Sequence, residues 1–468
     1  MSGSNPSTRL PAFSRFGAPT LSAARSASTR RGITLLSPIQ VLAAIAALSF
    51  VVNGALQQFE MQVTGGRVPF YPAVLKVCLL GLFPITLLLR GGRYKSNQRA
   101  VVFGLLFFGY LLFDVLFLLF YGNYKVSEIL LGYNTYFSLA LLAIVSLLIP
   151  LKIRSRHLVI SLCLLAVACA VIGLEQYLKN APILPTESSD KHFAVQVFSS
   201  GTYFNSFSLF EVPKAFALFF VFISSLLVAM WRRSRYRPII LVLLPASMAM
   251  CWIAHARTEL VALGWALIAS AYLTFRKSRS FIRWIPIAAF VSGIAVAFVA
   301  YFSFSQITGV HSFANTSSFV TRILEWRYYV SMLRDVGAGK LLFGMGFVEN
   351  ASLSAINGPL SIDNIYLSVV LDIGLIGLIL YLMLAWVLWE EVLSTLKFGA
   401  TSLHIAVAAT MSTFFLMGIF SNAPGLIVAY FLLYAISDDV EPVPIRDQDI
   451  SENPRARAGG GNVGVVRA

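Results

Sequence analysis

Charged side chains are scarce in this sequence. Asp, Glu, Lys and Arg make up 12% of the 468 residues, whereas 57% of the residues are hydrophobic. A soluble domain cannot bury that much apolar surface, and the mean hydropathy of +0.77 agrees with this. Repeated apolar runs of about 18 residues or more predict helices that cross a bilayer, because in lipid each backbone group must be hydrogen-bonded within its own segment. The composition therefore predicts an all-α, polytopic integral membrane protein.

Cysteine is also rare, with four residues in the chain. The four cysteines have neither the spacing of a metal site nor that of a disulfide framework, so we interpret them as packing residues within apolar runs: Cys78, Cys163, Cys169 and Cys251. No internal repeat is visible, so the inverted-repeat signature of many transporters is missing. The net charge of +15 does not indicate a nucleic-acid partner, because Lys and Arg hold the loops of membrane proteins in the cytoplasm.

The apolar runs divide the chain into three regions. We expect a disordered basic cytoplasmic tail at 1–36, a polytopic membrane domain at 37–437 and a disordered cytoplasmic tail at 438–468. About 12 transmembrane helices are expected, near 37–56, 70–89, 100–120, 128–150, 157–175, 213–231, 238–256, 258–275, 284–304, 364–388, 402–420 and 424–437. Alternate short loops are rich in arginine and lysine, which places them and both termini in the cytoplasm. Two long loops, at about 176–212 and 305–363, then face the opposite side.

The second long loop contains the stretch TRILEWRYYVSMLRD at 321–335. Apolar and aromatic residues recur there at helical spacing, which predicts an amphipathic helix. Arg322, Glu325, Trp326 and Tyr329 share one face of this helix, where Glu325 can hold Arg322 in place, and Arg327 points elsewhere. An alternative is an interfacial helix whose Trp and Arg residues only anchor it to lipid headgroups.

Two further features accompany that helix. Arg257, in HARTEL, lies at the outer end of a predicted span, where an arginine is costly unless it has an anionic partner. Alternatively, the negatively charged Glu259 nearby is the partner of Arg257. Gly344 and Gly346, in LLFGMGF on the long loop, permit a tight turn or a close approach of the backbone.

The next predicted span opens with DNIYL. Asp363, Asn364 and Tyr366 stand at its outer entry, and Asp363 has an alternative reading as the helix N-cap. Asp372 is nearly three turns deeper, where a carboxyl group is expected to be protonated or paired.

The order of these features resembles the O-antigen ligase/polymerase family of bacterial inner-membrane enzymes, which includes Wzy-type polymerases. The resemblance covers about Arg257 to Leu380, and GTYFNSFSLF at 201–210 is similar to the family's entry to the helix that follows it. It implies a donor glycan on undecaprenyl pyrophosphate, presented at the outer leaflet, with Arg257, Arg322 and Arg327 binding the pyrophosphate. Glu325, Trp326, Gly344, Gly346, Asn364 and Tyr366 would support this site.

The resemblance also implies how the reaction would run. Arginine suits a diphosphate because it is permanently charged and its fork matches phosphate oxygens, so no metal and no cofactor are expected. The family's ligases usually carry histidine before the Asn of the helix-entry motif, and here that place is Asp363. An aspartate could deprotonate the acceptor hydroxyl, with His255 and His311 as alternative bases.

We therefore expect an inner-membrane polysaccharide polymerase that joins lipid-linked repeat units at the periplasmic face during O-antigen, capsule or exopolysaccharide synthesis. The expected partners are the lipid bilayer, a flippase and proteins of chain-length control or export. The nearest alternative is a ligase that moves finished polymer to lipid A-core or to protein. A transporter or flippase of lipid-linked sugars is a third, and it would need charged residues deep within several spans.

Overall fold

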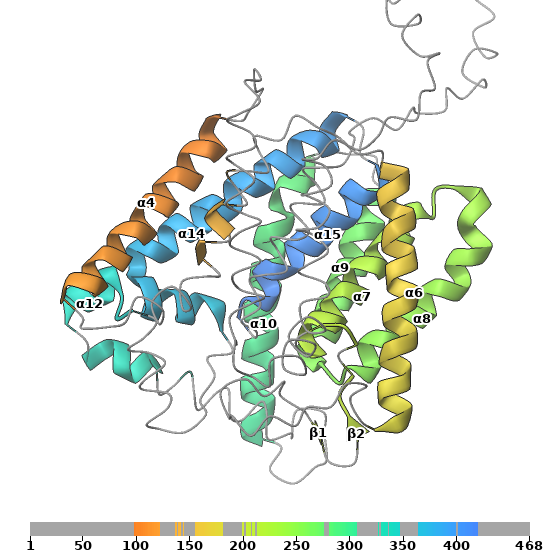
Figure 1. The fold of residues 1–468 in the computed structure, drawn as a ribbon, viewed down its shortest axis with the longest axis horizontal. Coiled ribbons are helices and arrows are strands. Elements are labelled where there is room, and N and C mark those ends of the chain that lie inside the picture. Colours follow the sequence, from red (N-terminus) through yellow and green to blue (C-terminus); the bar gives the residue numbers. More distant parts are fainter. Residues whose placement is uncertain are drawn as a thin grey trace, which may run out of the picture. The chain divides into compact units, whose positions relative to one another are not determined.

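The computed structural model describes the central part of the chain. It covers residues 98–121, 155–180, 203–206, 208–210, 213–275, 280–306, 337–346, 364–398 and 401–419, with single residues or short runs within 136–144, 199–200 and 326–335. Almost all of these residues are helical, in agreement with the all-α class (Figure 1). A two-stranded antiparallel hairpin, β1 (Ser199–Ser200) and β2 (Tyr203–Phe204), is the exception within these ranges.

Eight helices match eight of the predicted spans to within a few residues at most of their ends. They are α4 (Gln98–Tyr121), α6 (Ser155–Lys179), α7 (Pro213–Met230), α8 (Arg237–Ile253), α9 (Arg257–Phe275), α10 (Ile285–Gln306), α14 (Ile365–Phe398) and α15 (Ser402–Met417). Six helices in the described ranges are long and apolar enough to cross a membrane, and α8 and α15 are shorter apolar helices. The predicted spans near 37–56, 70–89 and 424–437 lie outside the described residues, so the total of about 12 stays a prediction.

Short helices join several of these elements. They are η1 (Ser234–Tyr236) before α8, η2 (Ser280–Trp284) before α10 and α12 (Ala338–Phe343) ahead of α14. The expected tight hairpin between the spans at 238–256 and 258–275 is confirmed, because α8 and α9 are separated by three residues only, 254–256.

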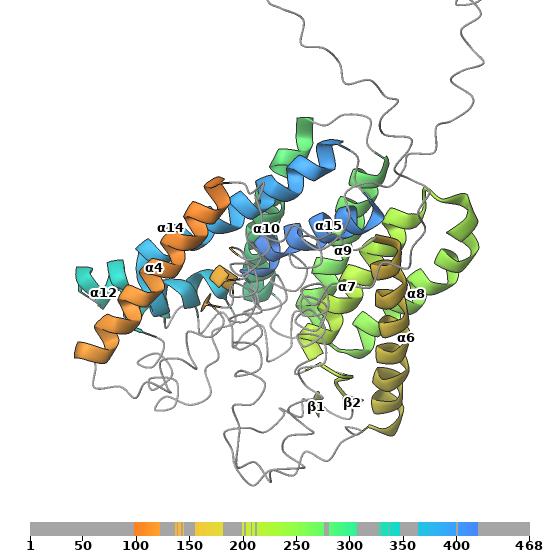
Figure 2. The ribbon, with the colours of Figure 1, turned by 45° about the horizontal axis from the view of Figure 1, so that its top comes forward.

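The helices pack as two groups, one around α7 and one around α14. Helix α7 contacts α8, α9 and α15, while α14 packs against α4 and α12, as both ribbon views show (Figures 1 and 2). Helix α15 also contacts α10 and α14, and so links the two groups. Large side chains fill the core, among them Phe107, Phe216, Phe219 and Trp389, each at most 2% exposed.

The surface of α4, α6, α8 and α10 is apolar. Leu105, Leu164, Val242 and Val299 are each more than half exposed, and they lie on four different helices. Such side chains are stable in contact with hydrocarbon and not with water. The described helices are therefore those of a membrane protein.

Candidate functional site

Arg257 is the first residue of α9 and lies at the α8–α9 hairpin. His255 forms the turn with a positive φ of 50°, and its ring lies 6.1 Å from that of Tyr177 at the end of α6. Burial and the charge of Arg257 both lower the pKa of His255 below its usual value. Both effects favour the neutral imidazole, which can accept a proton. Arg257 is partly exposed, and Glu259 in the first turn of α9 is fully buried.

The GTYFNSFSLF segment fastens this hairpin to α6. The Ser206 amide donates to the Ile253 carbonyl (3.3 Å) at the end of α8, and the Ser206 hydroxyl donates to the Gly173 carbonyl of α6 (2.8 Å). Two residues on, the Ser208 amide donates to the Gln176 side-chain oxygen (2.7 Å). The motif that resembles the family's helix entry is thus held beside the Arg257 hairpin.

The helix expected in the long loop is described at Trp326 and residues 329–335, which we call the loop helix. Tyr329 is 1% exposed and packs with Met345 and Leu371. Met345 lies in the glycine turn (residues 344–346), which follows α12. The loop helix, the glycine turn and α14 therefore meet at one buried cluster, which supports the expectation that the long loop contains an ordered helix.

Helix α14 is broken where the glycine turn meets it. Gly374 has φ 74° and ψ −178°, so two helical segments, 365–373 and 375–398, join there. The break frees carbonyl groups that an unbroken helix would bond internally. The Met345 amide donates to the Leu371 carbonyl (2.7 Å) and the Gly346 amide to the Asp372 carbonyl (3.1 Å), while the Tyr110 hydroxyl of α4 donates to the Ile373 carbonyl (2.7 Å).

Glycine is required on both sides of this contact. A Cβ on Gly374 would lie 2.2 Å from the Leu342 carbonyl oxygen, and a Cβ on Gly344, whose φ is +90°, would lie 2.4 Å from the Asp372 carbonyl oxygen. Both distances are far below van der Waals contact. The prediction that the Gly-x-Gly pair allows a tight turn or a close backbone approach is therefore confirmed for Gly344, and Gly346 is also left-handed at φ 79°.

Asp372 lies in the same place and is 1% exposed. Its Oδ2 accepts hydrogen bonds from the Tyr136 hydroxyl (2.8 Å) and from the Ser368 hydroxyl (3.1 Å). The carboxyl group that was expected to be protonated or paired thus has two hydroxyl partners. Its partner Tyr136 comes from a segment that is 236 residues earlier in the chain.

The entry to α14 is held by α15. The Asn364 side-chain oxygen accepts the Leu367 amide (2.9 Å), the bond of an N-cap to the third helical residue. Asn364 therefore caps α14, and Asp363, for which a capping role was considered, lies outside the described residues. The Ile365 amide donates to the Gly418 carbonyl (2.8 Å), and the Tyr366 hydroxyl donates to the Phe415 carbonyl (3.0 Å).

An apolar groove runs between α10, α14 and α15. It encloses about 1350 Å³ outside the protein atoms, counting its open side, and Trp326 of the loop helix is one of its walls. Phe290, Ile294 and Phe298 of α10 line it and are 37%, 47% and 62% exposed. Two of the helices that line the groove, α10 and α14, contain candidate membrane spans.

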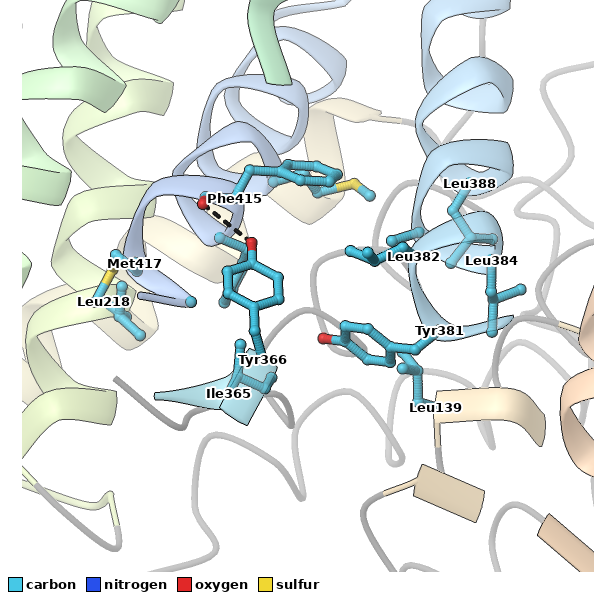
Figure 3. Close-up of a pocket in the computed structure, with 14 residues that line it drawn as sticks. Leu139, Leu218, Ile365, Tyr366, Tyr381, Leu382, Leu384, Leu388, Phe415 and Met417 are labelled. Atoms are coloured by element: carbon cyan, nitrogen blue, oxygen red, sulfur yellow. Dashed lines mark hydrogen bonds between the residues drawn. The ribbon is translucent and has the colours of Figure 1, made fainter. Parts of the chain in front are cut away.

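Tyr366 separates this groove from a second apolar cavity. The cavity lies between α7, α14 and α15, and Tyr366, Leu382 and Phe415 border both spaces. Figure 3 shows the Tyr366 ring standing in the cavity, with its hydroxyl bonded to Phe415 and with the Tyr381 hydroxyl pointing toward it. On the groove side the Tyr366 ring meets Phe290 edge-on, at 5.5 Å between centroids. Tyr366 therefore has a role in packing that the sequence alone did not indicate.

Several of the expected site residues lie outside the described residues. They are Arg322, Glu325, Arg327 and Asp363, together with the alternative base His311. The convergence of Arg257 with the two loop arginines therefore stays a prediction.

The sequence analysis missed three residues that build this region: Tyr110, Tyr136 and Gly374. A signal for Gly374 was present, because glycine inside an apolar span weakens the helix there. No local pattern marks the two tyrosines, since their partners are 263 and 236 residues away.

The comparison with known families agrees with this architecture. A family model described as O-antigen ligase matches residues 242–382. The matched part begins in α8, includes Arg257, the loop helix and the glycine turn, and ends beyond the break in α14. No curated protein matches the chain. Residues 242–382 are therefore similar to the O-antigen ligase family, which supports the resemblance to the O-antigen ligase/polymerase family.

Proposed function

We propose that this protein is a glycosyltransferase of the bacterial inner membrane that joins oligosaccharide repeat units carried on undecaprenyl pyrophosphate. Such a donor has a charged diphosphate next to a long hydrocarbon chain. The observation that carries the proposal is the place of Trp326, which lies in the arginine-bearing stretch of the long loop and also lines the apolar groove. One donor could thus contact arginines with its diphosphate and the groove with its chain.

The proposed chemistry is a single displacement at the anomeric carbon. Arg257, Arg322 and Arg327 would bind the diphosphate and stabilise its charge as it leaves. Asp363, or else His255 or His311, would take the proton of the acceptor hydroxyl. The bond from the anomeric carbon to the diphosphate oxygen breaks as the bond to the acceptor oxygen forms, so the configuration of that carbon inverts.

A ligase is the second candidate, and the family model's own description favours it. Asp363, which stands where related ligases carry histidine, favours the polymerase. A deletion strain separates the two. Loss of a polymerase leaves a product with a single repeat unit, whereas loss of a ligase leaves long chains on the lipid carrier.

The groove gives the proposal a structural test. Trp326→Ala should raise the KM for the lipid-linked donor about tenfold, because burying a large apolar side chain contributes about 1.5–3 kcal/mol. Trp252→Ala is the matched control, since Trp252 is 61% exposed on α8 and does not line the groove. Equal effects of the two substitutions would argue against a donor chain in the groove.

A further inference from the structure

A carboxyl group deep in a membrane helix is costly and is kept for a reason. Asp372 is such a group, and the proposed reaction uses no group at its depth. Its side chain accepts hydrogen bonds from Tyr136 and Ser368, at 2.8 and 3.1 Å. Its main-chain carbonyl accepts the Gly346 amide at 3.1 Å. One residue therefore joins α14, the helical residues around 136 and the glycine turn.

The helical segment 365–373 is bonded at both ends. At its start the Ile365 amide and the Tyr366 hydroxyl bond to carbonyls of α15. At its end the Leu371 and Asp372 carbonyls accept the amides of the glycine turn. The segment is only about 14 Å long, so a shift at Asp372 is passed directly to the entry of α14.

The carbonyl groups at the helix break next to Asp372 are hydrogen-bonded by other parts of the protein. The freed carbonyls of Leu371, Asp372 and Ile373 all have protein donors: two amides and the Tyr110 hydroxyl. In transporters, broken helices offer such carbonyls to a substrate or an ion. Here they bind the loop that also carries Trp326 and Tyr329. This favours a fixed joint over a transport site.

We infer that Asp372 is a positioning residue of the transferase: its hydrogen bonds fix the entry of α14 relative to the loop helix. The inference rests on the proposed function, because it assumes that the acceptor and the donor meet between these two elements. Asp372 does not contact the reacting atoms. It acts through the segment 365–373 on one side and through the glycine turn on the other.

The first test is kinetic. In Asp372→Leu the side chain keeps a similar volume, but both hydroxyl bonds to Oδ2 are lost. We expect kcat per folded protein to fall about tenfold or more, while the KM for the lipid-linked donor changes less than about threefold. Tyr136→Phe and Ser368→Ala should lower kcat in the same direction. Their effects should not add to that of Asp372→Leu, because all three act on one carboxyl group.

A matched control and a second readout keep the result clear. Ser225→Ala also removes a buried hydroxyl, one that bonds only to Val221 within α7 in the described contacts, and it should leave kcat unchanged. Hydrogen exchange of the Met345 and Gly346 amides should become about tenfold faster in Asp372→Leu, because the joint they bond to is loosened.

The outcomes separate the two proposals. If wild-type protein does not turn over lipid-linked oligosaccharides, the proposed function fails, and the exchange rates still decide whether Asp372 holds the joint. Unchanged exchange at residues 345 and 346 overturns the inference whatever the activity. Faster exchange with unchanged kcat per folded protein also overturns it, since Asp372 would then have a structural role alone.

Discussion

Replacing Gly374 by alanine should weaken the contact between the glycine turn of the long loop and α14. The backbone at Gly374, φ 74° and ψ −178°, is a conformation that essentially only glycine adopts, and strain of this kind costs about 1–3 kcal/mol. The new Cβ would also lie 2.2 Å from the Leu342 carbonyl oxygen. The glycine turn must then move away, which endangers the two hydrogen bonds from Met345 and Gly346, each contributing about 1 kcal/mol.

These effects together amount to about 4 kcal/mol. With an unfolding entropy of about 2.1 cal/mol/K per residue, that free energy lowers the Tm of a 468-residue chain by about 4 °C. Thermal unfolding of the purified protein in detergent measures the change. Gly264→Ala in α9 is the matched control, because its Cβ would meet nothing within 4 Å, and its Tm should stay within about 1 °C of wild type. A Gly374→Ala protein with the wild-type Tm would refute the close contact at the break.

Three further predictions concern the reaction and its pH dependence. Arg322→Lys should remove most of the activity at normal expression, because lysine keeps the charge but loses the bidentate fork; full activity in membranes would mean that charge alone suffices. Asp363→Asn should lower turnover by about 10²- to 10⁴-fold, and its Tm should be unchanged because Asn364 caps the helix. Asp363→His should have part of the wild-type turnover. Normal polymer from the Asn variant would turn attention to His255 or His311. The lowered pKa of His255 means that the unfolded chain takes up its proton first as the pH falls. The unfolding free energy should therefore decrease below about pH 6.5, and His255→Gln should flatten that decrease in Tm measured between pH 5 and 7.5; an unchanged slope would contradict it.

The spans could be predicted from the sequence because hydropathy and helix length are local properties. The α8–α9 hairpin, for example, follows from two apolar runs on either side of HARTEL, and the structure places its helices at Arg237–Ile253 and Arg257–Phe275. The extension of α14 to Phe398 was missed because Glu390 and Glu391 end the apolar run, although the helix continues through them. A helix continues wherever its backbone hydrogen bonds can form, whether or not its side chains are apolar.

The joint at Gly374 could not be predicted in the same way. Its bonds link Met345 to Leu371 and Tyr136 to Asp372, and such pairs depend on how distant segments pack. The sequence did indicate the participants, since it marked the glycine pair and the buried acid separately. It did not indicate that Asn364 caps α14, because Asp and Asn cap helices about equally well and stand side by side at the entry of that helix.

The reaction itself tests the central claim most directly. Purified protein in lipid vesicles would be incubated with undecaprenyl-pyrophosphate-linked repeat units, without added metal, and the products separated by size. The account predicts a ladder of longer lipid-linked chains and release of undecaprenyl pyrophosphate, both lost in Arg257→Ala. Repeat units that stay single with active, folded protein, or a ladder that forms equally well in Arg257→Ala, would contradict it.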